Sequence, residues 1–149
     1  MRTESLGQQD EEYLGGLESG RMVKAGGIAG YGVYVTTKRI IGVKSRRALF
    51  KQLAGATLGG MVGAALGARL SRDDSIRVIS ELEQKKDLEV LKENISGIEL
   101  RKPTFVHRGH IAVSTLSGDP VKVIIADKGD YQRLEALMRA FRPDVVTVV

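Results

Sequence analysis

The chain has 149 residues, of which 42% are hydrophobic and 28% charged, so it can form one domain with an ordinary core. It contains no cysteine, which excludes disulfides and thiolate chemistry and is compatible with a reducing compartment. The first residues include no apolar stretch typical of a signal peptide. We therefore expect a cytoplasmic protein, with association to a membrane as an additional expectation from the charge pattern below.

The net charge of +5 is unevenly distributed along the chain. Residues 19–72 contain ten Lys and Arg and no Asp or Glu, whereas the rest of the chain carries all 18 acidic residues against 13 basic ones. Such a block suits anionic headgroups, at about 1 kcal/mol for each basic residue near an acidic membrane. Solvated surface charge is the alternative. The candidate contacts to an anionic surface are Lys38, Arg39, Lys44, Arg46, Arg47, Lys51, Arg69 and Arg72.

The N-terminal third predicts a polar lead-in followed by short strands. Residues 1–19 are polar, with a short helical turn expected near residues 11–14. Strands are then expected at 21–25, 31–36 and 40–43, because these stretches are rich in β-branched and aromatic residues. A glycine-rich turn at 26–30 and a turn at 37–39 separate them, so the pattern is typical of a β-meander.

The next segment is a glycine zipper. Glycine falls at every fourth position within residues 52–68, which carry no charge, and a second row of small residues lies beside it. In a helix this spacing stacks the small residues into one smooth face, which we predict for helix 52–70. Glycine costs a helix about 1 kcal/mol relative to alanine, so another backbone or lipid must stabilise the segment. The candidate packing residues are Gly55, Gly59, Gly63, Gly67, Ala56, Gly60 and Ala64.

The zipper is too short to be a comfortable membrane span. About 17 residues at about 1.5 Å each give roughly 25 Å, less than the ~30 Å hydrocarbon core of a bilayer. Three interpretations follow: helices from several chains pack together, the helix lies shallowly in a membrane, or the segment is a Gly/Ala-rich linker.

The second half of the chain predicts two helices and four strands. Residues 72–86 have helical spacing, with Ile76, Ile79 and Leu82 on one side and Ser71 among the candidate N-caps. Strands are expected at 88–91, 95–102, 110–116 and 121–126, the last two forming a hairpin. A final amphipathic helix is expected at 131–141, and a β-like tail occupies 142–149.

Two motifs point to a known family. Residues 33–43, VYVTTKRIIGV, resemble the prokaryotic PH-like and GRAM-like signature of a hydrophobic strand, Thr-Asn-Lys-Arg and a second hydrophobic strand, with Thr37 at the Asn position. Residues 94–102, NISGIELRK, resemble the later ISxIELxK strand of these domains. The resemblance covers residues 20–141 and leaves 46–86 as an insertion, which contains the zipper helix and the helix 72–86.

The resemblance implies an α+β fold and a binding function. The expected architecture is a PH-like split β-barrel of about seven antiparallel strands, capped by the C-terminal helix. In such a domain the strands ending at Val43 and beginning at Leu88 share a sheet, so the insertion leaves and re-enters on one side. A specific inositol-phosphate pocket is not expected, because the loop 26–30 has no basic residue.

No pattern in the sequence asks for catalysis or a cofactor. His107 and His110 are the only histidines and have no metal-binding spacing, and no phosphate-binding glycine motif occurs. The sequence therefore predicts a non-enzymatic PH-like module that self-associates as a homo-oligomer, attaches to an anionic membrane, or does both. A peripheral anionic-lipid-binding protein without oligomerisation is the alternative. A weak nucleic-acid binder without sequence preference or an unrecognised enzyme is less favoured, and no specific nucleic acid is expected.

Overall fold

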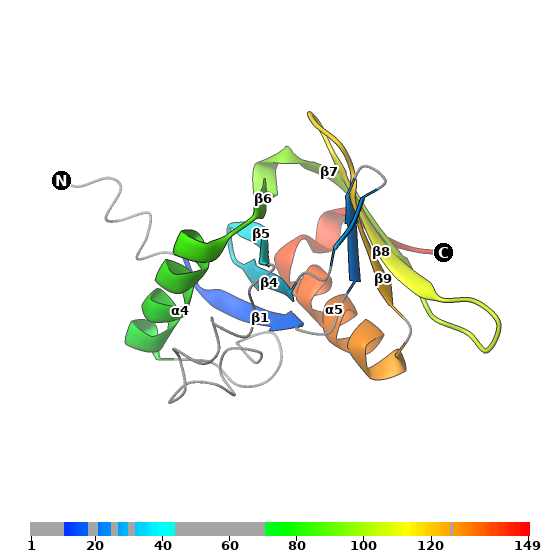
Figure 1. The fold of residues 1–149 in the computed structure, drawn as a ribbon, viewed down its shortest axis with the longest axis horizontal. Helices are drawn as coiled ribbons and strands as arrows, with labels where there is room; N and C mark the ends of the chain where they lie inside the picture. Colours follow the sequence, from blue (N-terminus) through cyan, green and yellow to red (C-terminus); the bar gives the residue numbers. More distant parts are fainter. Residues whose placement is uncertain (1–10, 18–20, 25–26, 30–31, 44–70, 126) are drawn as a thin grey trace.

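The computed structural model describes residues 11–17, 21–24, 27–29, 32–43, 71–125 and 127–149. In these residues the chain forms an α+β domain in which two α-helices accompany two β-sheets (Figure 1). The helices are α4 (Arg72–Lys85) and α5 (Lys128–Phe141), and short 3-10 turns occur at Lys92–Asn94 and Pro143–Val145.

The two sheets divide the chain unevenly. The four-stranded sheet is antiparallel and has the order β1 (Tyr13–Leu17), β4 (Gly32–Thr36), β5 (Arg39–Val43), β6 (Leu88–Leu91). The six-stranded sheet has the order β10 (Val146–Val148), β7 (Ile95–Arg101), β8 (Gly109–Thr115), β9 (Val121–Ile125), β2 (Arg21–Lys24), β3 (Gly27–Ala29). In this sheet β10 runs parallel to β7, whereas the other pairs are antiparallel.

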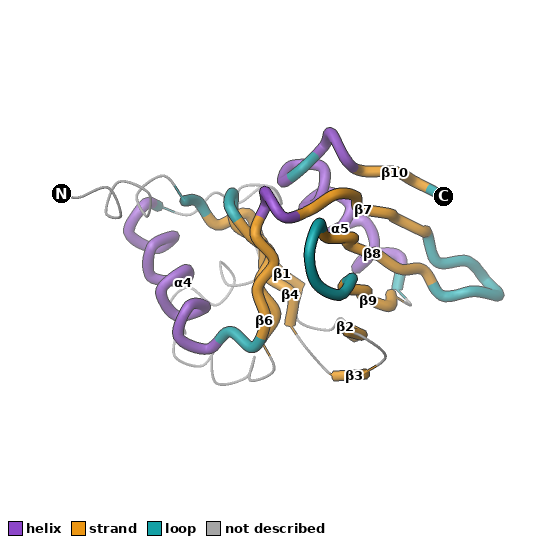
Figure 2. Tube along the Cα trace, turned by 90° about the horizontal axis from the view of Figure 1, so that it is seen from above, coloured by secondary structure: helices purple, strands orange, loops and turns teal. Residues whose placement is uncertain are grey.

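Helix α5 contributes to the main core, which both sheets share. Its N-cap is Asp127, whose carboxylate accepts a hydrogen bond from the backbone N–H of Asp130 at 2.9 Å. The predicted apolar stripe is confirmed, because all five of its members are buried. Residues of β4, β7, β8 and β9 join the same cluster, so α5 links the two sheets (Figure 2). The stripe consists of Tyr131, Leu134, Leu137, Met138 and Phe141.

The four-stranded sheet is buried on both faces. Val33 and Val35 of β4 belong to the core that contains α5, whereas Tyr34 between them packs in a second core with α4. Strands covered on both sides have no polar face, which explains the continuous apolar runs in β4 and β5. By contrast, β7 alternates, with Ile98 and Leu100 buried and Glu99 exposed, because its other face meets solvent.

Helix α4 covers the outer face of this sheet. Its N-cap is Ser71, whose hydroxyl accepts a hydrogen bond from the backbone N–H of Asp74 at 3.1 Å. The predicted helix is confirmed, but its buried stripe is shifted: Val78 is buried, and Ile76, which we expected to be buried, is 41% exposed. The buried residues of α4 are Ser75, Val78, Ile79 and Leu82.

Two sequence expectations about the strands are wrong. The N-terminal lead-in contains β1, which pairs with β4 in place of a helical turn. The glycine-rich turn contains β3. The predicted β-like tail is confirmed, because it contains β10, which pairs with β7. Residues outside 20–141 therefore take part in both sheets. The expected α+β class is confirmed: the described strands form two sheets, and the parallel β10 makes one of them mixed. The predicted zipper helix 52–70 lies outside the described residues.

Candidate functional site

The described elements on either side of residues 44–70 both belong to or pack on the four-stranded sheet. Strand β5 ends at Val43, and α4, which follows the segment, packs against β1 and β5 and leads into β6. Strands β5 and β6 are paired, and the backbone N–H of Asp87 donates to the carbonyl oxygen of Gly42 at 2.8 Å. The prediction that the strands at Val43 and Leu88 share a sheet is therefore confirmed.

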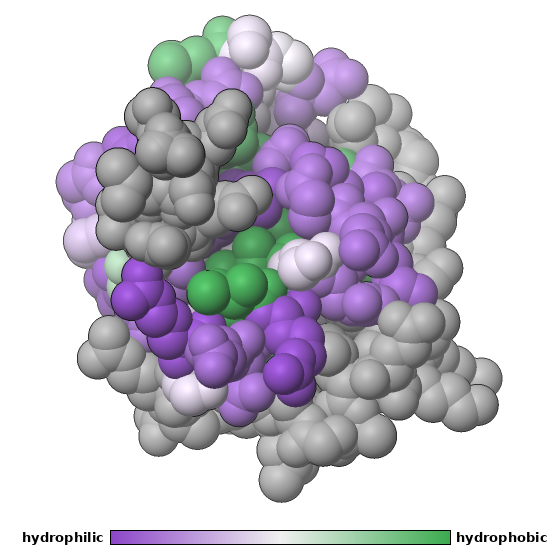
Figure 3. Space-filling model, turned by 90° about the vertical axis from the view of Figure 1, so that its left-hand side faces the viewer, coloured by the Kyte–Doolittle hydropathy of each residue, from purple (hydrophilic) through white to green (hydrophobic). Residues whose placement is uncertain are grey.

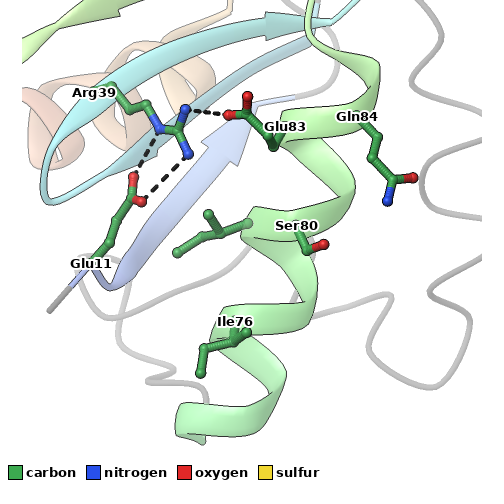
Figure 4. Close-up of a pocket in the computed structure, with 7 residues that line it drawn as sticks. Glu11, Arg39, Ile76, Ser80, Glu83 and Gln84 are labelled. Atoms are coloured by element: carbon green, nitrogen blue, oxygen red, sulfur yellow. Dashed lines mark hydrogen bonds and ion pairs between the residues drawn. The ribbon is translucent and has the colours of Figure 1, made fainter. Parts of the chain in front are cut away.

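A cluster of ionised side chains holds α4 against this sheet. The Nε of Arg39, at the start of β5, lies 2.9 Å from Oε2 of Glu11, just before β1. Its Nη1 lies 2.6 Å from Oε2 of Glu89 on β6 and also contacts Glu83 on α4. Figure 4 shows Glu11 and Glu83 pointing toward the guanidinium from opposite sides. One side chain thus joins four separate parts of the chain.

Two further groups complete this ion-pair cluster. The ammonium of Lys86 lies 3.0 Å from a carboxylate oxygen of Glu83 and 3.0 Å from one of Glu89. The hydroxyl of Thr36 donates to Oε2 of Glu11 at 2.6 Å and accepts from the backbone N–H of Arg39 at 3.1 Å. Because the Glu11 side chain is 6% exposed and that of Arg39 is 13% exposed, this pair is nearly buried.

The pairing moves the pKa values of the cluster in a consistent direction. Hydrogen bonds from Arg39 and Lys86 lower the pKa of Glu83. Burial would raise the pKa of Glu89, but hydrogen bonds from the same two cations outweigh it, so the pKa lies below its usual range. Burial would likewise lower the pKa of Arg39 and of Lys86, yet hydrogen bonds to the carboxylates raise both. All of these groups are therefore charged at neutral pH.

Two grooves flank the cluster and share Glu11 and Arg39. One, of about 400 Å³, runs along α4, and Figure 3 shows the face of the molecule on this side, where an apolar patch lies among polar side chains. The other, of about 540 Å³, lies beside Lys38, Leu91 and Lys92. The first groove is lined by Glu11, Arg39, Ile76, Ile79, Ser80, Glu83 and Gln84.

The ion-pair cluster connects helix α4 to the four-stranded sheet. Each of its carboxylates contacts a cation, so none is a free base, and its two cations are outnumbered by three carboxylates. This corrects one sequence prediction: Arg39 is not available to an anionic surface, because its charge is already balanced and its side chain is nearly buried.

The remaining predicted site residues are placed as follows. Lys38 is exposed in the turn between β4 and β5, and its carbonyl oxygen accepts from the backbone N–H of Lys92. Arg72 is exposed in the first turn of α4, next to Asp73 and Asp74. The zipper residues Gly55, Gly59, Gly63, Gly67, Ala56, Gly60 and Ala64, and the cations Lys44, Arg46, Arg47, Lys51 and Arg69, lie outside the described residues.

The histidines lie at different depths of one hairpin. His107 is exposed in the loop between β7 and β8, whereas Nε2 of His110 on β8 lies 2.7 Å from a carboxylate oxygen of Glu99 on β7. In the described part of the chain, no group of three or more His, Asp or Glu side chains is arranged to hold a metal ion. No helix among those residues is long and apolar enough to cross a membrane.

The comparisons with known proteins assign the chain to no family. No protein-family model matches the chain, and no curated protein matches it either. The resemblance to PH-like domains therefore rests on the sequence motifs alone.

Proposed function

We propose that the chain is a non-enzymatic PH-like interaction module that self-associates and attaches to an anionic membrane surface through its zipper segment, residues 44–70, which comprises the glycine zipper and the cations that flank it. One observation carries the proposal. Both anchors of the segment, β5 and α4, sit on the same sheet, so an uncharged run flanked by cations leaves and returns on one side of the domain. A segment of this kind suits shallow insertion or helix packing better than a single crossing.

The PH-like part of the proposal has its own support. The C-terminal helix packs against both sheets. The motif segment 33–43 forms two strands of the four-stranded sheet, and the segment 94–102 forms a strand of the six-stranded sheet. The ion-pair cluster and the second core with α4 hold the end of the insertion firmly. An anchored base of this kind favours a segment that reaches a partner outside the domain.

The test measures solution mass and vesicle binding together. Light scattering on the full chain, with and without phosphatidylserine-containing vesicles, should give an oligomer that binds these vesicles and is released as salt rises. Changing Arg46, Arg47 and Lys51 together to Ser should weaken vesicle binding on the order of a hundredfold, from about 1 kcal/mol for each charge. Equal binding to neutral and anionic vesicles would contradict the membrane part.

A second pair of variants tests the zipper. Gly59→Leu with Gly63→Leu should push partner backbones apart and give a more monomeric protein, although leucine favours a helix by close to 1 kcal/mol per site. Thr57→Leu with Ala65→Leu is the matched control, because these positions lie on the opposite side of the predicted helix. A parent that is monomeric, and unchanged by both pairs, would overturn self-association and favour the linker interpretation.

A further inference from the structure

The loop between β7 and β8 carries two apolar side chains at its tip. Phe105 is fully exposed and Val106 is 81% exposed. Figure 1 and Figure 2 both place this loop at the end of the molecule opposite α4, where it extends beyond the sheet. Single exposed apolar residues are common and need no explanation. Here two adjacent apolar residues lie on a projecting loop, where they contribute nothing to the chain's own core.

The tip is a closed turn whose residues go against turn preference. The backbone N–H of Thr104 donates to the carbonyl oxygen of His107 at 2.8 Å, and the N–H of His107 donates to the hydroxyl of Thr104 at 3.0 Å. Phe105 and Val106 are therefore the two central residues, positions where Gly, Asn, Asp or Pro are favoured. A local choice that opposes both turn chemistry and solubility indicates a functional position.

The root of the hairpin is rigid. Pro103 and Gly109 are buried against each other, and a Cβ on Gly109 would overlap the carbonyl oxygen of Arg101 and lie 2.6 Å from the nitrogen of Pro103. This close approach leaves room for no residue other than glycine. The tip is thus presented on a closely packed base, so the backbone at the root has little further freedom to lose when the tip binds.

Cations surround the tip. Arg101, Lys102 and Arg108 are exposed, and residues 100–118 contain no Asp or Glu. The acidic residue just before this stretch, Glu99, lies against His110 at the root. An apolar tip with a cationic collar matches the interface of an anionic bilayer, where acyl chains begin just below negative headgroups.

We propose that Phe105 and Val106 insert into the interfacial layer of an anionic lipid bilayer while Arg101, Lys102 and Arg108 contact its headgroups. The choice of partner rests on the proposed function, but this contact is separate from the zipper and lies on described residues. A lipid explains both apolar residues, whereas a nucleic acid would use the aromatic ring for stacking and leave Val106 without a role.

Fluorescence tests the insertion directly, because the chain contains no tryptophan. In the full chain, Phe105→Trp places a single reporter at the tip, and Leu116→Trp places one on the 72% exposed residue at the other end of β8. Vesicles containing phosphatidylserine should shift the emission of the tip reporter to the blue and allow its quenching by doxyl lipids, whereas the reporter at position 116 should change in neither respect.

Binding measurements give the second readout. Phe105→Ser with Val106→Ser should weaken co-sedimentation with anionic vesicles at least about tenfold, since the tip would lose its apolar contact. Leu116→Ser is the control and should bind as the parent does. Both substitutions lie on exposed side chains, so unchanged thermal unfolding should accompany them.

The outcomes separate this proposal from the proposed function. If the parent binds anionic vesicles but neither the emission of the tip reporter nor the binding of the serine variant differs from its control, membrane attachment by the insertion stands and the tip proposal is overturned. If the parent binds no vesicle, the membrane part of the proposed function and the tip proposal both fail. If an oligonucleotide rather than vesicles shifts the emission of the tip reporter, the tip is a nucleic-acid contact and the lipid proposal is overturned.

Discussion

At the α4 end of the molecule the charged side chains are paired with one another, whereas at the hairpin end they surround two exposed apolar residues. Arg39 contacts three carboxylates and is nearly buried. Arg108 is exposed, and among the described residues its side chain makes no ion pair. The two arginines differ only in their surroundings. Their roles follow from that difference: one stabilises the domain, and the other is available to a partner.

The comparison shows why a count of charges along the chain is a poor guide to binding. The basic block 19–72 includes Arg39, whose charge is paired with carboxylates inside the domain. It excludes the exposed cations of the hairpin, which are Arg101, Lys102 and Arg108. The ion pairs of Arg39 are partly buried, so removing one partner should lower the stability of the fold. The hairpin cations are exposed, so changing them should have little effect on stability, since surface substitutions seldom alter it by more than about 0.5 kcal/mol.

The largest effect should come from removing the cation of the ion-pair cluster. Arg39→Met leaves Glu11, 6% exposed, with the Thr36 hydroxyl as its one remaining partner among the described residues, so we expect a loss of about 3 kcal/mol in the free energy of unfolding. Arg77→Met on the exposed side of α4 is the control and should cost less than about 0.5 kcal/mol. Urea unfolding of both variants measures this, and equal losses would contradict a structural role for the cluster.

A smaller loss should follow from disturbing the root of the hairpin. Gly109→Ala forces a Cβ against the Arg101 carbonyl oxygen, so we expect about 2 kcal/mol of destabilisation from overpacking. In the neighbouring strand, Gly97→Ala meets nothing within 4 Å and should be neutral or slightly stabilising. Thermal unfolding distinguishes the two, and indistinguishable melting curves would show that the root is not tightly packed.

Much of the fold could be predicted from periodicity, and the misses have local causes. The strand at 88–91 and the stripe of α5 matched, because one is bounded by turns and the other has clear helical spacing. Strand β1 was missed because it contains two glycines, which are depleted in strands. Gly15 has a φ of 143° beside a bulge, and a Cβ on Gly16 would overlap the ring of Tyr34, so both glycines are needed where they lie.

The ion-pair cluster could not be predicted, because its members are far apart in the chain. Arg39 meets Glu11, Glu83 and Glu89 across 28, 44 and 50 residues, a distance over which no spacing rule applies. The hairpin tip could have been predicted from the sequence. Phe105 and Val106 between Lys102 and Arg108 contradict ordinary turn composition, and that contradiction was the available signal.

The smallest effect should be a loss of stability in acid. The pKa of Glu83 and the pKa of Glu89 are lowered in the folded protein, because hydrogen bonds from Arg39 and Lys86 outweigh the opposing effect of burial. At pH values near and below 4.5, the usual pKa of a glutamate carboxyl group, the unfolded chain therefore binds more protons than the folded one. Stability from these groups is present above that pH and is lost as pH falls through the folded values. Because both side chains are partly exposed, we expect about 1 kcal/mol in total after solvent screening.

Glu83→Gln tests this, because it removes one titrating carboxylate from the cluster. Unfolding free energies from urea titrations between pH 7 and pH 3 should fall less steeply for this variant than for the parent. Ser80→Gln, on the same helix, adds the same side chain without removing a carboxylate and should follow the parent. Parallel curves for Glu83→Gln and the parent would mean that Glu83 gains nothing from its cations. The α4 end would then resemble the hairpin end in carrying charges that do not stabilise the fold.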